Sequence, residues 1–459
     1  MNCLIPSTKS PEFILTHLGG YEGVTGSCHL LQVKGLNILV DCGSVQGDDT
    51  AVTPEDWPVS VSDINYLFLT HAHIDHIGRV PELVRGGFKG EIITTHGTKA
   101  LLLPMLEDAL SFSAYSEKEA AVYLDTIDDL AWGFEYNETF DLRRGLRFTL
   151  GRAGHILGSC FIRFEWENPA GSLIFSGDLG ARNTPLLPDP DIPAPCDFLV
   201  LESTYGDRCH EDRRERTRRL AEALSRALND GGKVFIPAFA VGRVEEVVYE
   251  MDRIFSDPHW QGAFPDLSVK RRIPVFLDSP LGIRITEIYS RLSEYWDREA
   301  KSLLRRGDHP IDFANLYAVK NYEDHRKVLE MPGPSVIIAG SGMCTGGRIV
   351  EHLKSGLEDP CNDLFFVGYQ ARGTPGRAIM EYSRRSEGYL MLEGRRYRIR
   401  AKVDALSGYS AHADQKELLE WVSSLSAKPS MIRLVHGEPG SRHSLQELLR
   451  QQGYRVATV

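Results

Sequence analysis

The sequence lacks any apolar run long enough to cross a membrane. No stretch of about 18 apolar residues occurs along the chain, and the opening segment MNCLIPSTKSPEF is too polar for a signal peptide. Cysteine is sparse, because its eight residues stand singly, with no C-x-x-C pair. Scattered thiols are typical of reduced cytosolic proteins rather than of disulfide-rich secreted domains. These absences predict a cytoplasmic protein that does not span a membrane.

Basic residues are outnumbered by acidic ones, which gives a formal net charge of −11. This charge argues against nonspecific wrapping of a polyanion. A metal site and a local basic groove can nevertheless hold a phosphate backbone on an acidic protein. The composition, 42% hydrophobic and 25% charged, is that of a globular protein. At 459 residues the chain is too long for one ordinary core, so we expect two or three domains.

The pattern of expected strands and helices changes twice along the chain. Residues 1–205 contain short β-branched or leucine-rich runs separated by turns, and this pattern returns in residues 379–459. Between them, strands alternate with helices at the spacing of βαβ units. We therefore predict an α/β protein whose first domain is interrupted by a doubly wound α/β domain at residues 206–378.

The stretch LTHAHIDHIG, residues 69–78, gathers four side chains of the types that bind metals. His71 and His73 are two positions apart, so their rings point the same way in an extended segment. Asp75 and His76 follow where the chain turns toward a helix. Ligands on both sides of a turn suit a pair of metal ions better than one. Imidazole and carboxylate at this density favour zinc, with manganese or iron as alternatives.

Three more residues of these types each follow an apolar strand. They are His155 in GRAGHILGS, Asp178 in LIFSGDLG and His436 in IRLVHGEPG. Any one of them alone would more often be a turn residue. The repeated placement is expected where one edge of a sheet sandwich builds a site, so we predict that all three complete the metal centre.

With Asp41 preceding them, these residues occur in an order that resembles the metallo-β-lactamase superfamily of αββα hydrolases. The resemblance implies that the first domain is an αββα sandwich. It assigns one zinc ion to His71, His73 and His155, and a second to Asp75, His76 and His436. It also implies that Asp178 bridges the two ions and that Asp41 orients the ligand loop.

The long interval between Asp178 and His436 points to one branch of this superfamily, because a whole domain must lie between the two residues. The segments ESTYGDR, GSGMCTGGR, SGYSAHADQ and LVHGEPG look like those of the β-CASP nucleases. They are most similar to bacterial and archaeal relatives of the endonuclease subunit of the cleavage and polyadenylation specificity factor. Glu202, His412 and His436 occupy three motifs of that family. Histidine in the third motif matches the RNA-processing members, whereas the DNA-repair members carry valine there.

The resemblance implies a ribonuclease with two zinc ions per chain. A water activated by both metals would attack phosphorus and leave a 5′-phosphate and a 3′-hydroxyl. The expected catalytic residues are Asp75, Glu202 and His412, with His412 as general acid and Glu202 raising its pKa. The alternative for His412 is a residue near the N-cap of the helix that follows. RNA is the expected partner, and a homodimer, like the choice between internal cutting and cutting from a 5′ end, stays open.

Substrate contacts are predicted at Ser410, Arg243, Arg348, Arg372 and Arg377. The four arginines lie beyond expected α/β strands, where such sheets bind ligands, although each alone would fit a surface arginine. The segment RRYRIRAKV, residues 395–403, is predicted as one strand that places Arg396, Arg398, Arg400 and Lys402 on one face. We expect that face to be solvated, with an RNA path as the alternative.

Three other functions compete with this interpretation. A DNA nuclease of the repair type is disfavoured by His436. A non-catalytic pseudo-nuclease scaffold is disfavoured because every ligand position and both proton-transfer positions are filled. A thioester or lactam hydrolase would require the inserted domain to leave the metal centre open.

Overall fold

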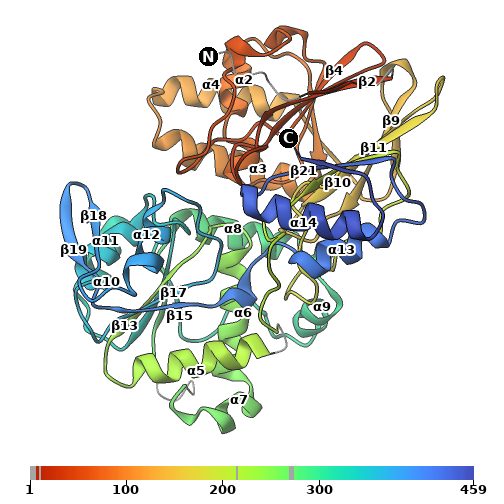
Figure 1. The fold of residues 1–459 in the computed structure, drawn as a ribbon. Helices are drawn as coiled ribbons and strands as arrows, with labels where there is room; N and C mark the ends of the chain where they lie inside the picture. Colours follow the sequence, from red (N-terminus) through yellow and green to blue (C-terminus); the bar gives the residue numbers. More distant parts are fainter. Residues whose placement is uncertain (1–6, 10–11, 213–214, 268–272, 459) are drawn as a thin grey trace. The chain divides into compact units, whose positions relative to one another are not determined.

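Figure 1 shows a computed structural model, which describes residues 7–9, 12–212, 215–267 and 273–458. The chain forms two compact units. The first comprises Met1–Arg182, Asp189–Cys209 and His412–Val459, and the second comprises Asn183–Pro188 and His210–Ala411. The second unit therefore extends beyond residue 378, where we predicted its end, because β20 (Lys402–Ala405) pairs with a strand of its sheet.

The first unit contains two seven-stranded sheets. One has the order β1 (Ser7–Lys9), β2 (Phe13–Gly19), β3 (Cys28–Val33), β4 (Leu36–Val40), β5 (Tyr66–Phe68), β6 (Glu91–Thr95) and β7 (Ala131–Phe134). The other has the order β22 (Val456–Thr458), β21 (Met431–Val435), β12 (Phe198–Glu202), β11 (Gly171–Phe175), β10 (Cys160–Trp166), β9 (Leu146–Arg152) and β8 (Thr139–Asp141). Hydrophobic side chains of both sheets share one buried cluster, so the sheets pack face to face.

Aromatic rings fill the space between these sheets. Phe68 of β5 lies edge-on to Phe148 and Phe164 of the opposite sheet, with ring centroids 5.0 and 4.8 Å apart. Such edge-to-face pairs contribute about 0.5–1.5 kcal/mol each beyond the area that they bury. The buried runs of the two sheets thus meet in a single interior, as expected for a sandwich.

Helices cover the outer faces of the sandwich (Figure 1). On the first sheet lie α2 (Val80–Arg85), α3 (His96–Ser111) and α4 (Glu117–Leu130), and on the second lie α13 (Gln415–Ser423) and α14 (Pro439–Gln451). In β12, Phe198 and Val200 face the interior between the sheets, while Leu199 and Leu201 face α13 and α14. Because successive side chains of a strand alternate in direction, this strand, which is apolar from Phe198 to Leu201, is buried on both faces. The first unit is therefore the predicted αββα sandwich.

The last part of the chain enters the second sheet beside β12. β21 pairs with β12 in parallel, and Glu202 lies opposite Val435. This pairing places His436, which directly follows β21, next to the loop after β12. There the backbone N–H of Ser203 donates to the His436 carbonyl at 3.1 Å. A sheet register thus brings together segments far apart in the sequence.

The second unit is built on a six-stranded sheet in which every pairing is parallel. Its order is β15 (Leu316–Ala318), β14 (Val275–Leu277), β16 (Ser335–Ala339), β13 (Lys233–Pro237), β17 (Asp363–Phe366) and β20. Its helices are α5 (Arg216–Leu228), α6 (Arg243–Ser256), α7 (Pro258–Ala263), α8 (Pro280–Arg291), α9 (Arg298–Arg305), α10 (Tyr322–Glu330), α11 (Arg348–Gly356) and α12 (Pro375–Tyr382). Strands alternating with helices around a buried parallel sheet match the predicted doubly wound unit.

A two-stranded hairpin of β18 (Tyr389–Leu392) and β19 (Arg395–Arg398) belongs to this second unit. The single strand predicted over residues 395–403 was wrong, because the chain leaves β19 and enters the six-stranded sheet only at β20. Between the two strands, the N–H groups of Arg400 and Ala401 both donate to the Leu357 carbonyl, at 2.9 and 3.0 Å. These bonds tie the connection to the end of α11 and break the strand.

Among the described residues, no helix is both long and apolar enough to cross a bilayer.

Candidate metal centre

The ligand loop follows β5 and ends in the short helix α1 (Ile74–Ile77). Neighbouring backbone holds it in place, since the carbonyl groups of Asp75 and His76 accept hydrogen bonds from Ser27 and Cys42 at 2.8 and 2.7 Å. The chain passes so close that a Cβ on Gly43 would lie 1.6 Å from the Asp75 carbonyl oxygen. Only glycine fits there. The loop is therefore fixed by its neighbours as well as by its own sequence.

Four predicted ligands form one group around Asp178. Its Oδ2 atom lies 3.5 Å from His71 Nε2 and 3.7 Å from His155 Nε2. The Nδ1 atom of His73 lies 3.1 Å from Nε2 of both His71 and His155. Asp178, His71 and His155 are at most 2% exposed, so the group is closed to solvent on those sides.

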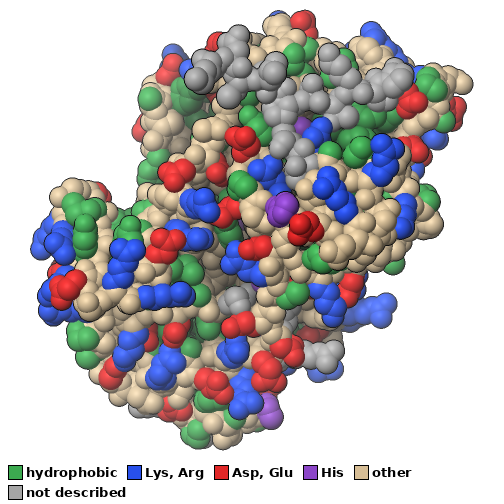
Figure 2. Space-filling model, viewed as in Figure 1, with side chains coloured by type: hydrophobic (Ala, Val, Ile, Leu, Met, Phe, Trp, Pro, Cys, Tyr) green, Lys and Arg blue, Asp and Glu red, His purple; other side chains and the backbone are tan. Residues whose placement is uncertain are grey.

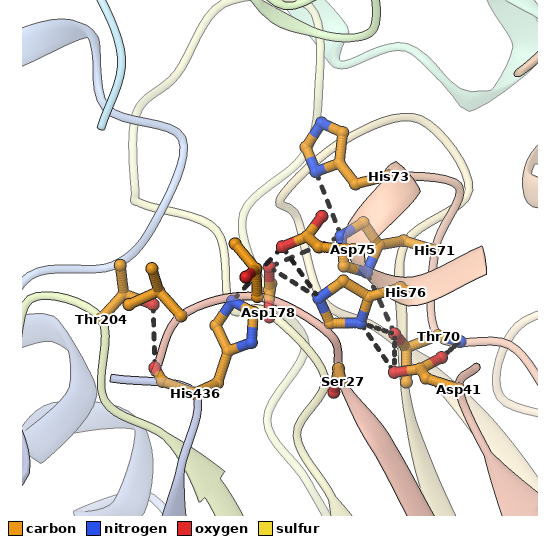
Figure 3. Close-up of polar contacts among 12 residues, drawn as sticks. Ser27, Asp41, Thr70, His71, His73, Asp75, His76, Asp178, Thr204 and His436 are labelled. Atoms are coloured by element: carbon orange, nitrogen blue, oxygen red, sulfur yellow. Dashed lines mark hydrogen bonds and ion pairs between the residues drawn. The ribbon is translucent and has the colours of Figure 1, made fainter. Parts of the chain in front are cut away.

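The other predicted ligands approach the same aspartate from another side. Asp178 Oδ2 lies 3.3 Å from His76 Nε2, and Asp178 Oδ1 lies 3.4 Å from His436 Nε2. Asp75 Oδ2 is 3.9 Å from Nε2 of both His76 and His436. Figure 3 shows these rings and carboxylates pointing toward one another. The structure thus brings all seven predicted ligands together, with Asp178 common to the two groups.

Asp41 and Thr70 brace two of these imidazoles (Figure 3). Asp41 accepts from the Thr70 N–H at 2.8 Å and from its hydroxyl at 2.9 Å, and its Oδ2 lies 2.7 Å from His76 Nδ1. The Thr70 hydroxyl also lies 3.0 Å from His71 Nδ1. Asp41 is thus placed as predicted for a residue that orients the ligand loop. The role of Thr70 was missed, although it directly precedes the histidine motif.

Two residues of the site have left-handed backbone conformations. Asp41 follows β4 with φ 59°, and His436 follows β21 with φ 51°. A non-glycine residue pays about 1–2 kcal/mol for this conformation. Such strain persists where the surrounding structure over-determines it, which is common at functional sites.

Burial sets the protonation of the imidazoles in the first group. It lowers the pKa of His71 and His155 well below the usual value, and that of His73 to about 4, despite the nearby carboxylates. Neutral imidazole is the form that binds metal. His76 differs, because Asp178, Asp41 and Asp75 outweigh its burial and raise its pKa well above the usual value.

The donor set fits metal ions better than a hydrogen-bonded cluster. Ligand atoms about 2.0–2.1 Å from a tetrahedral ion are about 3.3 Å apart, close to the 3.1–3.7 Å separations around Asp178. Within the described chain, His76 Nε2 and Asp178 Oδ1 are buried and make no hydrogen bond. Buried polar atoms are normally satisfied, so these two indicate a missing cationic partner. The protein therefore carries a site for a metal cofactor.

A second cluster of histidine and aspartate, in the second unit, has different geometry. Asp278 Oδ2 lies 2.6 Å from both His325 Nδ1 and His352 Nε2, and Asp278 Oδ1 lies 2.6 Å from the Arg348 guanidinium. These are lengths of charge-assisted hydrogen bonds, and a guanidinium opposes the binding of a cation. We assign this cluster to the structure of the second unit rather than to metal binding.

His412 and Glu202 lie beside the metal centre in the same unit. His412 Nδ1 is 3.2 Å from Glu202 Oε1 and 3.9 Å from Asp178 Oδ2. Glu202 is fixed by two backbone donors, Leu179 N–H at 2.7 Å and Thr204 N–H at 3.2 Å. Burial lowers the pKa of His412, but Glu202, with Asp178 and Asp75, outweighs it and raises that pKa overall. A protonated imidazole held by a carboxylate is the arrangement expected of a general acid.

The alternative prediction, that His412 is a residue near the N-cap of the following helix, is not supported by its contacts. The N-cap of α13 is Asp414, whose carboxylate accepts from the Glu417 N–H in a complete capping box. His412 instead lies in a β-bridge with Gly180, two residues after Asp178. The bridge directs the histidine to the metal centre.

Two predicted substrate contacts are engaged inside the second unit. Arg243 is 3% exposed, and its guanidinium pairs with Glu246 at 2.6 Å. Arg348 binds Asp278 and also donates to the Val319 carbonyl at 2.8 Å. Internal partners occupy both guanidiniums, so the structure gives no support to them as substrate contacts.

The remaining three predicted contacts also belong to the second unit. Arg372 is exposed, Arg377 is half-buried with Glu381 at 2.6 Å from its Nε atom, and Ser410 is buried. Their contact with substrate stays a prediction.

Three family models match successive parts of the chain. They describe the metallo-beta-lactamase superfamily at residues 21–238, a Beta-Casp domain at 244–379 and a Zn-dependent metallo-hydrolase RNA specificity domain at 396–459. The chain is also 38% identical over 446 residues to Ribonuclease TTHA0252 of Thermus thermophilus, covering 96% of each chain. The chain belongs to the β-CASP family of the metallo-β-lactamase superfamily. It is therefore a metal-dependent nuclease, which confirms the predicted family, fold class and enzyme class.

More distant β-CASP similarity extends to archaeal proteins. The chain is 32% identical over 460 residues to the transcription termination factor FttA of Methanocaldococcus jannaschii, covering 96% of this chain and 70% of that protein. A crystal structure of a protein of unknown function from Enterococcus faecalis superposes with a TM-score of 0.53 and 12% identity over 97% of both chains. That structural likeness supports the fold alone.

Proposed function

We propose that this β-CASP protein is a zinc-dependent ribonuclease with two metal ions per chain. The observation that carries the proposal is the convergence of six histidine and aspartate side chains around a seventh, Asp178, with the His412–Glu202 pair beside them. RNA as substrate is supported by the name of the relative from Thermus thermophilus, a ribonuclease, and by the match to an RNA specificity domain.

The ligand groups divide naturally between two ions. His71, His73 and His155 would hold one zinc, Asp75, His76 and His436 would hold the other, and Asp178 would bridge them. When bound, the two ions would supply a water activated near neutral pH and neutralise charge on the phosphate oxygens. Asp41 would keep His76 aimed at its ion through the contact at 2.7 Å.

The chain's own residues would provide the proton for the leaving group. Cleavage that leaves a 5′-phosphate expels a ribose 3′-oxygen, which is a poor leaving group unless it is protonated. With Nδ1 held by Glu202, the His412 ring would deliver a proton from Nε2. Proton transfer of this kind contributes about 10²–10⁴-fold to rate.

Purified protein incubated with RNA and DNA oligonucleotides of one sequence tests the substrate and the products. We expect zinc-dependent cleavage of RNA, with fragments that carry 5′-phosphate and 3′-hydroxyl ends. Equal cleavage of DNA, or fragments with 2′,3′-cyclic phosphate ends, would contradict the proposal. 5′-labelled and internally labelled RNA would separate internal cutting from cutting at a 5′ end.

The proton-donor role of His412 has a separate test. We expect His412→Ala to slow RNA cleavage about 10²–10⁴-fold. The same variant should hydrolyse the p-nitrophenyl ester of thymidine 5′-monophosphate nearly as fast as wild type, because p-nitrophenolate leaves without a proton. Zinc content is measured for both proteins. An equal loss on both substrates at unchanged zinc content would show that His412 is no proton donor.

A further inference from the structure

The β18–β19 hairpin presents two chemically different faces. Leu390, Leu392 and Tyr397 point inward and belong to the buried cluster of the second unit. The outward face carries Tyr389 and Met391, which are 42% and 52% exposed. Large side chains this exposed are costly to hydrate, so the outward face of this small sheet resembles a binding surface more than an ordinary solvated one.

This hairpin region is strongly basic within an acidic protein. Residues 384–400 contain six arginines and two glutamates, a net charge of +4, whereas the chain as a whole carries −11. Both glutamates are already paired, Glu387 with Arg398 and Glu393 with Lys354. Five exposed arginines have no carboxylate partner among the described residues: Arg384, Arg385, Arg395, Arg396 and Arg400. In the view of Figure 2, basic and hydrophobic side chains lie next to one another where Figure 1 places the hairpin.

Three arginines of this region lie over aromatic rings. The guanidinium carbon of Arg396 lies 4.0 Å from the centroid of the Tyr389 ring on the outward face. Arg395 lies 5.2 Å from the Tyr397 centroid, and Arg385 lies 4.6 Å from that of Tyr382 on α12. Stacking pre-orders these cations and leaves flat surfaces beside them.

Positive charge combined with exposed flat groups matches one class of ligand. A single-stranded nucleic acid offers phosphates to the arginines and unpaired bases that stack on tyrosine or guanidinium planes. A duplex keeps its bases stacked inside the helix, and an acidic peptide lacks the planar groups. The pattern on the hairpin therefore fits an unpaired strand.

We propose that the outward face of the β18–β19 hairpin binds single-stranded RNA, with Tyr389 and Arg396 as its central contacts. The identity of the strand as RNA rests on the proposed function. The surface contains none of the predicted metal ligands or proton-transfer residues, so it contributes to substrate binding and not to the chemical step.

Binding of a 12-nucleotide fluorescein-labelled RNA, followed by anisotropy, tests this surface. The parent protein is full-length His412→Ala, which removes cleavage during the measurement. We expect Tyr389→Ala with Arg396→Ala to raise Kd roughly 10- to 100-fold, since stacking contributes about 1–3 kcal/mol per base. Tyr389→Phe should bind like the parent, because it keeps the ring.

Tyr322→Ala with Arg326→Ala is the matched control, an exposed tyrosine and arginine on α10 of the same unit. It should leave Kd within twofold of the parent. Both double variants change only exposed side chains, and equal melting temperatures establish that they fold. An unchanged Kd in the hairpin variant would overturn the proposal. An equal rise in Kd for an RNA duplex of the same sequence would overturn it too.

The hairpin proposal and the ribonuclease proposal can fail independently of each other. In the active protein, the hairpin variant should raise KM for RNA while hydrolysis of the p-nitrophenyl ester stays unchanged. If the protein with His412 intact cleaves no RNA but its Kd still depends on the hairpin, the ribonuclease proposal is rejected and this one is retained. RNA cleavage with a hairpin-independent Kd and KM would reject this one alone.

Discussion

At the scale of single residues, the metal centre depends on side chains that aim the ligands. Asp41 accepts two hydrogen bonds from Thr70 and lies 2.7 Å from His76 Nδ1. Partners of this kind fix the orientation of a metal-binding imidazole, and their loss typically lowers metal affinity about 10–100-fold.

We therefore expect Asp41→Asn to weaken zinc binding by about one to two orders of magnitude. Cleavage should fall at limiting zinc and recover when zinc is in excess. Competition with a chromophoric chelator measures the affinity. Asp197→Asn is a matched control, because Asp197 also accepts from one backbone N–H and one hydroxyl, both of Ser172. If both variants keep wild-type zinc affinity, Asp41 does not support the ligands.

The side chain of Glu245 leads to a prediction about how the stability of the fold depends on pH. This fully buried carboxyl caps α6 and accepts from the Gly242 N–H and the Thr286 hydroxyl. Burial, opposed by these hydrogen bonds, raises its pKa to about 8 from 4.5. A raised folded-state pKa means that the folded protein binds the proton more tightly. Its contribution to stability is therefore complete below about pH 4.5 and is lost as the pH rises to about 8.

We expect Glu245→Gln to remove much of this decline, a difference on the order of 3–5 kcal/mol in the free energy of unfolding between the two pH limits. Denaturant unfolding between pH 4.5 and pH 8.5 measures it, with the exposed Glu222→Gln as control. A decline equally steep in Glu245→Gln and wild type would show that Glu245 is not its source.

At the scale of structural elements, the Asp278 cluster joins three parts of the second unit. Asp278 follows β14, His325 lies on α10, and Arg348 and His352 lie on α11. Burial would raise the pKa of Asp278, but hydrogen bonds from His352, His325 and Arg348 lower it to about 2. The charged aspartate therefore holds the two helices to the strand.

We expect Asp278→Asn to destabilise the second unit by about 3–5 kcal/mol, the usual cost of leaving a buried charge without its partner. Chemical denaturation measures this loss, and zinc content reports the first unit separately. Asp404→Asn is the control. Asp404 lies on β20 of the same sheet, and its side chain pairs at the surface with Arg226 of α5. A loss below about 1 kcal/mol would mean that the cluster is not a structural tie.

Local patterns in the sequence were enough to predict the ligand loop and the sheets. His71 to His76 lie close together in the sequence, and alternating apolar runs mark the strands. Long-range contacts could not be predicted in the same way. The strand expected over residues 395–403 breaks because two of its N–H groups bond the distant Leu357 carbonyl. Arg348 resembled a ligand contact because its carboxylate partner, Asp278, lies far away in the sequence. Arg243 differs, because its partner Glu246 lies three residues along the same helix and was overlooked.

At the scale of the whole molecule, chain topology brings the site together. The seven predicted ligands come from the ligand loop, from the ends of β9 and β11, and from the loop after β21. The parallel pairing of β12 with β21 closes the long interval before His436. Because the inserted unit separates these segments in sequence, the metal centre depends on the complete fold of the first unit.

Zinc titration into metal-free protein, with bound zinc and RNA cleavage measured on the same samples, tests this convergence most directly. We predict that cleavage appears only as binding approaches about two zinc ions per chain. His436→Ala should bind about one ion tightly and cleave at least about 100-fold more slowly. Full activity with one bound ion, or unchanged zinc stoichiometry in His436→Ala, would contradict a two-metal centre completed by the end of the chain.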